Sequence, residues 1–279
     1  MKTVGEIFQL SVQYLDQKRV SRSKFLMQQL LCHVLQIDKI SLFMGFDRPL
    51  HEEELQVIRS SLGLLVQGKP LEQILGKVLF FGCDIVLTPD VLIPRPETEI
   101  LMDMISKEIS QEPCVVWDIC TGSGCIGLSL KKRFPSFSVT LSDICHKALA
   151  VAETNADRNG LDVQFKLGDL LEPFTGEKAD LIICNPPYIS VAEYQGLDRS
   201  VKEYEPEIAL VGGVFGDEFY QRMAQDLPRH LNPHAKVYFE IGFAQGERVL
   251  ELFSASIWKE KKLINDWSGH NRFFFLEIE

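Results

Sequence analysis

The feature that most constrains this chain is the stretch 179–188, in which a short apolar run stops abruptly at two prolines. Residues 180–184 are almost entirely apolar, which is typical of a strand buried on both faces of a parallel sheet. Pro186 and Pro187 have no backbone N–H to donate to a neighbouring strand, so they end this one at once. Asn185 is therefore expected at the carboxyl end of a central strand, the edge at which open α/β sheets bind ligands.

Asn185, Pro186 and Tyr188 together offer the groups that bind a planar –NH2 group. The side-chain oxygen of Asn185 and the backbone carbonyl of Pro186 can each accept one N–H, and the Tyr188 ring can cover the face of the plane. Pro186 also favours extended geometry at Asn185, which aims the Asn185 side chain out of the sheet edge. A turn that merely closes a strand would have the same residues, so the rest of the chain has to decide.

From residue 114 onward the sequence alternates between strand-like and helix-like segments, which predicts an α/β fold with a doubly wound parallel sheet. Strands are expected at 115–120, 138–143, 163–167, 180–184 and 235–242. Helices are expected between them, with a long loop after the fourth strand. Two further strands, 262–266 and 272–278, are expected to close the chain as a hairpin.

The first 75 residues instead predict a small helical bundle, because apolar residues recur there at helical spacing. A Ser21-x-Ser23 signal is expected to start its second helix. Such a bundle can dock a partner or simply cap the larger domain. Residues 76–97 predict a β-hairpin and a stiff proline-rich linker that holds Arg95 between two prolines, and residues 98–279 predict the catalytic domain.

Composition places the chain among ordinary globular proteins, with 46% hydrophobic and 24% charged residues. No apolar run reaches the roughly 18 residues of a membrane span, and no signal-peptide pattern is found. The seven cysteines form no C-x-x-C pair, so reduced cysteines, a cytoplasmic location and no metal site are expected. The net charge of −10 argues against direct binding to nucleic acid, which needs a basic surface.

A glycine-rich turn follows the first predicted strand of the sheet. Gly122, Gly124 and Gly127 match G-x-G-x-x-G, and Asp143 ends the next strand about 20 residues further on, as in dinucleotide-binding proteins. S-adenosylmethionine needs the same ribose-binding acid, so the turn alone leaves both cofactors open. Asp169, after the third strand, is well placed for an adenine amino group. The Asn185 cluster lacks an obvious hydride-transfer partner, although Tyr188 keeps an NAD-binding oxidoreductase as an alternative.

Several segments then narrow the interpretation. The sequence Asn-Pro-Pro-Tyr at 185–188, behind Asp-Ile-Cys-Thr-Gly-Ser-Gly at 118–124, resembles the S-adenosylmethionine-dependent amino methyltransferases. Four further segments, at 70–76, 92–99, 204–210 and 239–242, are together similar to the peptide chain release factor glutamine methyltransferases (the HemK/PrmC family). The similarity extends over almost the whole chain. It departs at one point, because the usual glycine before the Thr-Gly-Ser-Gly run is Cys120 here.

The resemblance implies a class I S-adenosylmethionine-dependent methyltransferase with a Rossmann-like seven-stranded sheet and a docking role for the N-terminal helices. The implied reaction is methylation of the glutamine side-chain amide in the Gly-Gly-Gln loop of class I peptide chain release factors. The catalytic and substrate-binding residues would be Asn185, Pro186, Pro187 and Tyr188. The cofactor would be bound by Cys120, Thr121, Gly122, Ser123, Gly124, Asp143, Asp169, Leu170, Asn185 and Arg95.

Orientation is the expected basis of catalysis, because a carboxamide nitrogen is a poor nucleophile and two well-placed acceptors would hold it against the methyl donor. Three alternatives stay open at this point. The acceptor could be a ribosomal-protein glutamine or an adenine amino group of nucleic acid. The chain could also be an oxidoreductase that binds NAD, or a binding module without activity.

Overall fold

A computed structural model describes residues 2–279, and the chain divides into two compact units, Met1–Gly76 and Lys77–Glu279. Residues 77–97, which the sequence suggested as a separate hairpin and linker, group with the second unit. Among the helices of residues 2–279, none is long and apolar enough to cross a bilayer.

The first unit consists of helices around one apolar core. Its helices are α1 Val4–Gln17, α2 Ser23–Leu35, α3 Lys39–Met44, α4 Glu52–Val66 and α5 Leu71–Leu75. Leu15 and Leu31 are fully buried at its centre, as the helical spacing predicted, and Met27 is buried beside them. Ser23 does not cap α2 as expected, because Arg22 is the N-cap residue and the Ser23 hydroxyl donates to Asp16 Oδ1 at 2.5 Å.

Two helices of this unit were not predicted. α3 and α5 have six and five residues, which is too short for an apolar period to show. α3 begins where Asp38 accepts a hydrogen bond from the Ser41 N–H at 2.8 Å, and α5 begins after Pro70.

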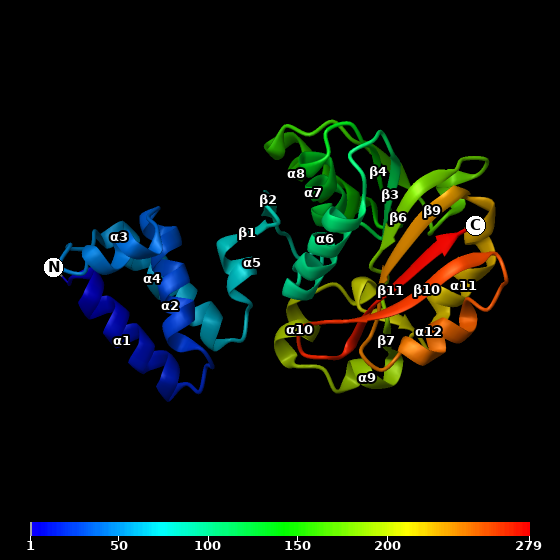
Figure 1. Ribbon diagram of the computed structural model, residues 1–279. Helices are drawn as coiled ribbons and strands as arrows, with labels where there is room; N and C mark the ends of the chain where they lie inside the picture. Colours follow the sequence, from blue (N-terminus) through cyan, green and yellow to red (C-terminus); the bar gives the residue numbers. More distant parts are fainter. Residues whose placement is uncertain (1) are drawn as a thin grey trace. The chain divides into compact units, whose positions relative to one another are not determined.

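The second unit is built on a seven-stranded sheet of order β10-β11-β9-β6-β3-β4-β5 (Figure 1). The strands are β3 Val115–Ile119, β4 Ser138–Asp143, β5 Gln164–Leu167, β6 Ala179–Cys184, β9 Leu231–Glu240, β10 Trp258–Asn265 and β11 Asn271–Ile278. Within the described sheet only β11 runs against its neighbours. The predicted α/β fold with seven strands is therefore confirmed. β6, which ends at Cys184, is the central strand, so Asn185 lies where the sequence placed it.

Helices cover both faces of the sheet, which explains why its inner strands β3 and β6 are largely apolar. The helices are α6 Pro96–Glu108, α7 Cys125–Arg133, α8 His146–Asn159, α11 Glu218–Asp226 and α12 Gly246–Leu252. Side chains alternate along each strand: Val116 joins the core under α6, α7 and α8, while Trp117 joins the core under α11 and α12. A separate hairpin, β1 Lys77–Phe80 and β2 Cys83–Val86, was also predicted.

The segment after β6 was predicted to be one long loop, but it contains short helices and strands. It contains β7 Ile189–Ser190, α9 Val191–Gln195, α10 Arg199–Tyr204, the 3-10 turn η2 Glu207–Ala209 and β8 Val211–Gly213. β7 and β8 pair in parallel, which returns the chain to the residues that follow Asn185. The largest changes in the predicted strands are at β9, which begins at Leu231 and not at residue 235, and at β10, which begins at Trp258 and not at residue 262.

Candidate active site

The glycine-rich turn between β3 and α7 is held from below by a buried acid. Asp118 Oδ2 accepts the Thr121 hydroxyl at 2.6 Å and the Gly127 N–H at 2.8 Å. Burial raises the pKa of Asp118 to about 7, against the opposing effect of these two hydrogen bonds. A Cβ on Gly127 would lie 2.1 Å from Leu141 Cδ2, so only glycine lets α7 pack this closely on β4.

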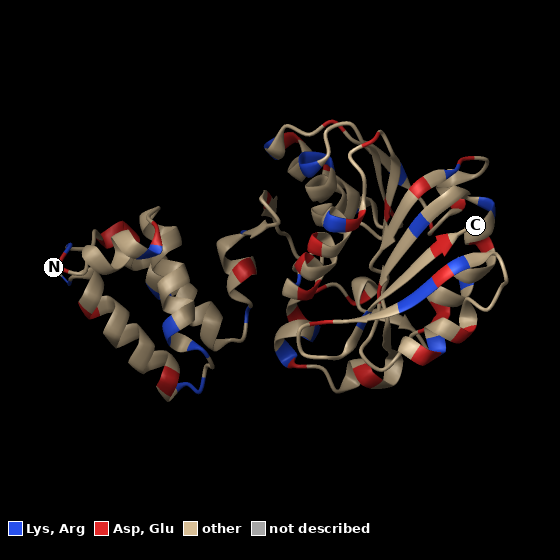
Figure 2. Cartoon of the chain, viewed as in Figure 1, with Lys and Arg blue, Asp and Glu red and all other residues tan. Residues whose placement is uncertain are grey.

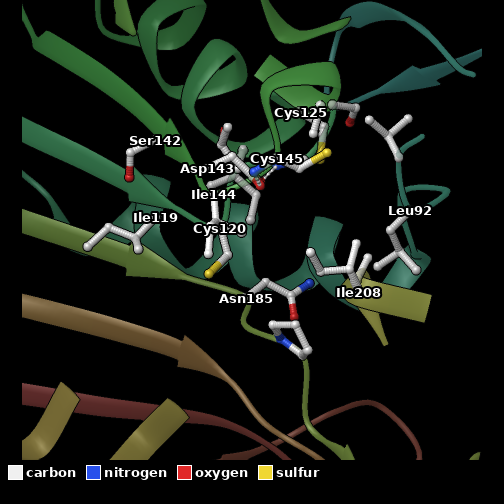
Figure 3. A pocket seen from close by; sticks show the side chains of 18 of the residues that line it. Leu92, Ile119, Cys120, Cys125, Ser142, Asp143, Ile144, Cys145, Asn185 and Ile208 are labelled. Atoms are coloured by element: carbon white, nitrogen blue, oxygen red, sulfur yellow. Dashed lines mark hydrogen bonds between the residues drawn. The ribbon is translucent and has the colours of Figure 1, made fainter. Parts of the chain in front are cut away.

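Cys120, the position at which the family resemblance implied a glycine, adopts φ +58°. This left-handed conformation costs a residue with a Cβ about 1–2 kcal/mol, whereas glycine adopts it freely. The departure noted in the sequence therefore falls on a position where backbone geometry favours glycine. The Cys120 side chain faces the cavity beside the turn (Figure 3).

Asp143 ends β4 and turns its carboxylate toward the same turn. Oδ2 accepts the Gly122 N–H and Oδ1 accepts the Cys145 N–H, both at 2.9 Å. Burial raises the pKa of Asp143, and the backbone hydrogen bonds oppose that effect. Each carboxylate oxygen has two acceptor positions, so the oriented carboxylate can still accept hydroxyl groups from the cavity.

A first cavity of about 180 Å³ runs along the carboxyl ends of four neighbouring strands (Figure 3). Asn185 follows β6, the turn of Cys120 follows β3, Asp143 ends β4 and Asp169 follows β5. The predicted cofactor residues that line it are Arg95, Cys120, Thr121, Gly122, Ser123, Asp143, Asp169, Leu170 and Asn185. Gly124 does not line the cavity. It is the N-cap residue of α7 and adopts φ +82°. The structure thus brings together side chains that lie up to 90 positions apart along the sequence.

A second cavity of about 170 Å³ meets the first at Asn185. Both cavities also share Leu92, Arg95 and Ala209. The second cavity is lined further by Tyr188, Ile189, Leu197, Val201 and Leu210. Its lining has no carboxylate and no imidazole, so it suits an apolar side chain that carries a neutral polar group. Pro187 lines the first cavity and Pro186 lines neither.

The surroundings of Tyr188 disfavour an ionised phenol. Burial, followed by the charge of Glu240, raises the pKa of its phenol, so the hydroxyl is neutral across the physiological range. Its oxygen lies 3.5 Å from Arg272 Nη1. A raised pKa disfavours the proton-handling role that the oxidoreductase alternative would give to Tyr188.

Arg95 lines the first cavity, but a buried acid already compensates its charge. Arg95 Nη2 lies 2.6 Å from Glu205 Oε1, and the Glu205 side chain is 1% exposed. Glu205 Oε2 also accepts the Ile93 N–H at 3.0 Å. The pair joins the proline-rich segment to the chain before η2, which is a clear structural role beside the predicted contact with a cofactor carboxylate.

Two further residues that position the site were missed from sequence. The Gln245 side-chain amide donates to the Tyr188 carbonyl at 2.9 Å and to the Gly216 carbonyl at 3.0 Å. A Cβ on Gly212 would lie 2.4 Å from the Pro187 carbonyl oxygen, so β8 approaches the prolines through a glycine. Gln245 carried no signal, because it lies 57 residues from Tyr188 and outside any motif. Gly212 and Glu205 lie in or beside a segment that the sequence presented as a loop.

The comparisons with known proteins agree with this geometry. Two family models match, PrmC N-terminal domain over residues 6–76 and Methyltransferase small domain over residues 96–199. The release factor glutamine methyltransferase of Geobacter sulfurreducens is 37% identical, with 97% of this chain and 95% of that protein covered. That of Bacillus subtilis is 36% identical, with 98% and 96% covered, and that of Chlamydia trachomatis serovar L2 is 46% identical, with 75% and 72% covered.

The chain belongs to the release factor glutamine methyltransferase family. The family, the enzyme class and S-adenosylmethionine as the cofactor, all expected from the sequence, are confirmed. Solved structures agree in fold: a Pyrococcus furiosus methyltransferase has a TM-score of 0.54 at 21% identity, covering 71% of this chain and 89% of that one. The hMettl16 catalytic domain has a TM-score of 0.57 at 16% identity, with 71% and 76% covered.

The first cavity has the chemistry that this methyltransferase cofactor needs. Asp143 offers an oriented carboxylate for ribose hydroxyls, and Ile126, Ala148 and Leu170 offer apolar walls for a base. The turn amides of residues 121–124 lie at the start of α7, where polar and negative groups are favoured. In residues 2–279, no group of three or more His, Cys, Asp or Glu is arranged to hold a metal ion.

Proposed function

We propose that this chain transfers the methyl group of S-adenosylmethionine to the side-chain amide nitrogen of the glutamine in the Gly-Gly-Gln loop of class I release factors. The observation that carries the proposal is the position of Asn185, which borders both cavities. An acceptor amide held in the second cavity would therefore meet the contents of the first cavity at Asn185.

The second cavity supports a glutamine side chain as the acceptor. Leu92, Ile189 and Leu210 would surround its two methylene groups, and the terminal amide would reach Asn185. The Asn185 side-chain oxygen would accept one of the two N–H bonds, while the Tyr188 ring covers the amide plane. The predicted second acceptor, the Pro186 carbonyl, is not part of this arrangement, because Pro186 lines neither cavity. Bound S-adenosylmethionine supplies an electrophilic methyl group on a sulfonium centre.

Orientation, more than proton abstraction, would make this poor nucleophile react. The second cavity presents no carboxylate or imidazole base, and Tyr188 is a neutral phenol. The amide proton becomes acidic as the N–C bond forms, so no strong base is needed beforehand. Fixing the nitrogen and its partner in place can lower a barrier by up to about 7–11 kcal/mol, and acceptors aimed at the developing positive charge add to this effect.

Charge supports a protein substrate over nucleic acid. The net charge is −10, and the view in Figure 2 shows Lys and Arg interspersed with Asp and Glu over the second unit. Two lysines of β10 are paired with acids, Lys259 with Glu277 and Lys262 with Glu260. We extend the proposal to a docking role for the first unit and to the cytoplasm, where the seven free cysteines would stay reduced.

The test is to incubate the chain with a candidate release factor and labelled S-adenosylmethionine, and then to map the label by mass spectrometry. We expect the label on the Gly-Gly-Gln glutamine, and none on a release-factor variant with asparagine there. Ribosomal proteins and RNA serve as competing substrates in parallel reactions. Preferential label on either of these would overturn the assigned substrate.

A further inference from the structure

Apart from Arg95, the cofactor residues predicted from sequence lie at strand ends or beside them, but one wall of the first cavity comes from α11. Phe219 and Arg222, three residues apart on this helix, line the cavity. Tyr220 and Met223, on the neighbouring face, are fully buried in the core under the sheet. The core therefore fixes the rotation of α11 and points the Phe219–Arg222 face at the cavity.

Arg222 is paired with one of the predicted cofactor residues. Its Nη2 lies 2.8 Å from Asp169 Oδ2, and the two side chains are 44% and 29% exposed. An ion pair with this exposure contributes little to folding stability, about 0–1 kcal/mol. Both partners line the cavity, so the pair can contact a bound ligand.

The position of the pair in the sheet identifies which part of a ligand it meets. β6 is central and carries the reacting end at Asn185, while β5 is the edge strand and precedes Asp169. Asp143, the candidate ribose acceptor, ends β4 between them. A ligand with its methyl group near Asn185 and its ribose at Asp143 therefore has its base beside Asp169, Arg222 and Phe219.

We propose that Arg222 is a specificity-determining residue for the cofactor: it holds the Asp169 carboxylate so that Oδ1 accepts an N–H from the exocyclic amino group of adenine. Asp169 Oδ2 is ion-paired with Arg222, and the side-chain hydrogen bonds found in residues 2–279 include none to Asp169 Oδ1. A guanidinium suits this task because it is planar and always charged, and it also packs against the face of a ring. Phe219 supplies the apolar surface beside it.

The experiment measures cofactor recognition alone and needs no protein substrate, so it is separate from the test of the release-factor reaction. It rests on the first cavity being the cofactor site. Calorimetry compares the binding of S-adenosylhomocysteine with that of S-inosylhomocysteine, which has a carbonyl oxygen in place of the amino group. The wild type should bind the adenosyl compound about tenfold more tightly, the expected effect of one hydrogen bond to a charged acceptor.

Arg222→Met keeps an unbranched apolar stem and removes the charged guanidinium. This variant should bind the two compounds with affinities within about twofold of each other, mainly because it binds the adenosyl compound more weakly. Asp169→Asn should have the same effect. Arg222→Lys should keep part of the discrimination. The matched control is Arg229→Met, because Arg229 pairs with Asp226 at 3.8 Å just after the same helix and away from the cavity.

Melting temperatures without ligand separate this role from a structural one, since Arg222→Met should melt close to the wild type. Three results would overturn the proposal: a wild type that does not discriminate, an Arg222→Met variant that still does, or equal weakening of both compounds. If Arg222→Met fails to fold, the Asp169→Asn and Arg222→Lys variants decide the question by the same ratio.

Discussion

The two cavities of the site are built in different ways. In the first, the contacts that shape the turn are close in sequence: Asp143 is 21 residues from Gly122 and two from Cys145. In the second, the shaping contacts are distant: Glu205 lies 110 residues from Arg95, and Gln245 lies 57 residues from Tyr188. The glycine-rich turn on the cofactor side is therefore specified locally at strand ends, and the acceptor side depends on tertiary assembly. Variants that separate cofactor binding from transfer test this contrast.

The largest effect is expected at the junction of the two cavities. Asn185→Ala removes the side-chain acceptor for the substrate amide and should lower turnover about 10²–10³-fold, as for other preorganised groups in active sites. Cofactor affinity should stay within a few-fold, because the turn and Asp143 are intact. Single-turnover kinetics and calorimetry measure the two quantities. Near-normal turnover would refute the orienting role of Asn185.

The next effect concerns the acid beneath the turn. The folded-state pKa of Asp118 is raised to about 7, so its stabilising contribution is full below the unfolded pKa and is lost as the pH rises to about 7. Asp118→Asn lacks this titration. We expect the free energy of unfolding, measured with denaturant, to fall between pH 5 and pH 8 by about 2–3 kcal/mol more in the wild type than in the variant. Parallel pH profiles would show that Asp118 titrates normally.

A cofactor-side variant should act on binding. Asp143→Ala removes the ribose acceptor and the bonds to Gly122 and Cys145 N–H, and it should weaken cofactor binding about 10–100-fold. Calorimetry with S-adenosylhomocysteine measures this loss. Asp157→Ala, on the exposed face of α8, is the control and should bind normally. Unchanged affinity of the Asp143 variant would show that this carboxylate does not contribute to cofactor binding.

An acceptor-side variant should do the reverse. Gln245→Ala frees the Tyr188 and Gly216 carbonyls, so the second cavity should lose its shape while the first is kept. We expect kcat/KM for the release factor to fall about tenfold, because the Tyr188 backbone loses one hydrogen bond that positions it, with cofactor affinity unchanged. Gln225→Ala, on the exposed side of α11, is the control. A loss of cofactor affinity would contradict the separation of the two cavities.

The smallest effect is expected at Cys120. Cys120→Gly relieves the left-handed backbone strain at φ +58° but increases the freedom of the unfolded chain, so the net gain in stability should be about 0.5–1 kcal/mol. The midpoint of denaturant unfolding measures it. Lower stability in the variant would mean that packing of the thiol outweighs the strain.

The sequence predicted most of the sheet because each buried strand is a separate apolar run with its own stop signal. It failed on segments without such a signal. α3 and α5 are single short turns, and residues 189–213 hold two short helices and a small parallel pair whose order comes from contact with residues 185–188. Ser23 does not cap α2 as predicted, because its hydroxyl donates a hydrogen bond to Asp16 on the preceding helix.

The sequence by itself determined the α/β class, the central strand, the glycine turn with Asp143, and the family, because these depend on local runs and fixed spacings. The tertiary structure alone decided that Asn185 borders two cavities, that Glu205 compensates Arg95, that Gln245 holds Tyr188, and that Arg222 holds Asp169. The physical reason is that hydrogen bonds and ion pairs act between atoms close in space, and residues far apart in sequence leave no periodic pattern by which to find them.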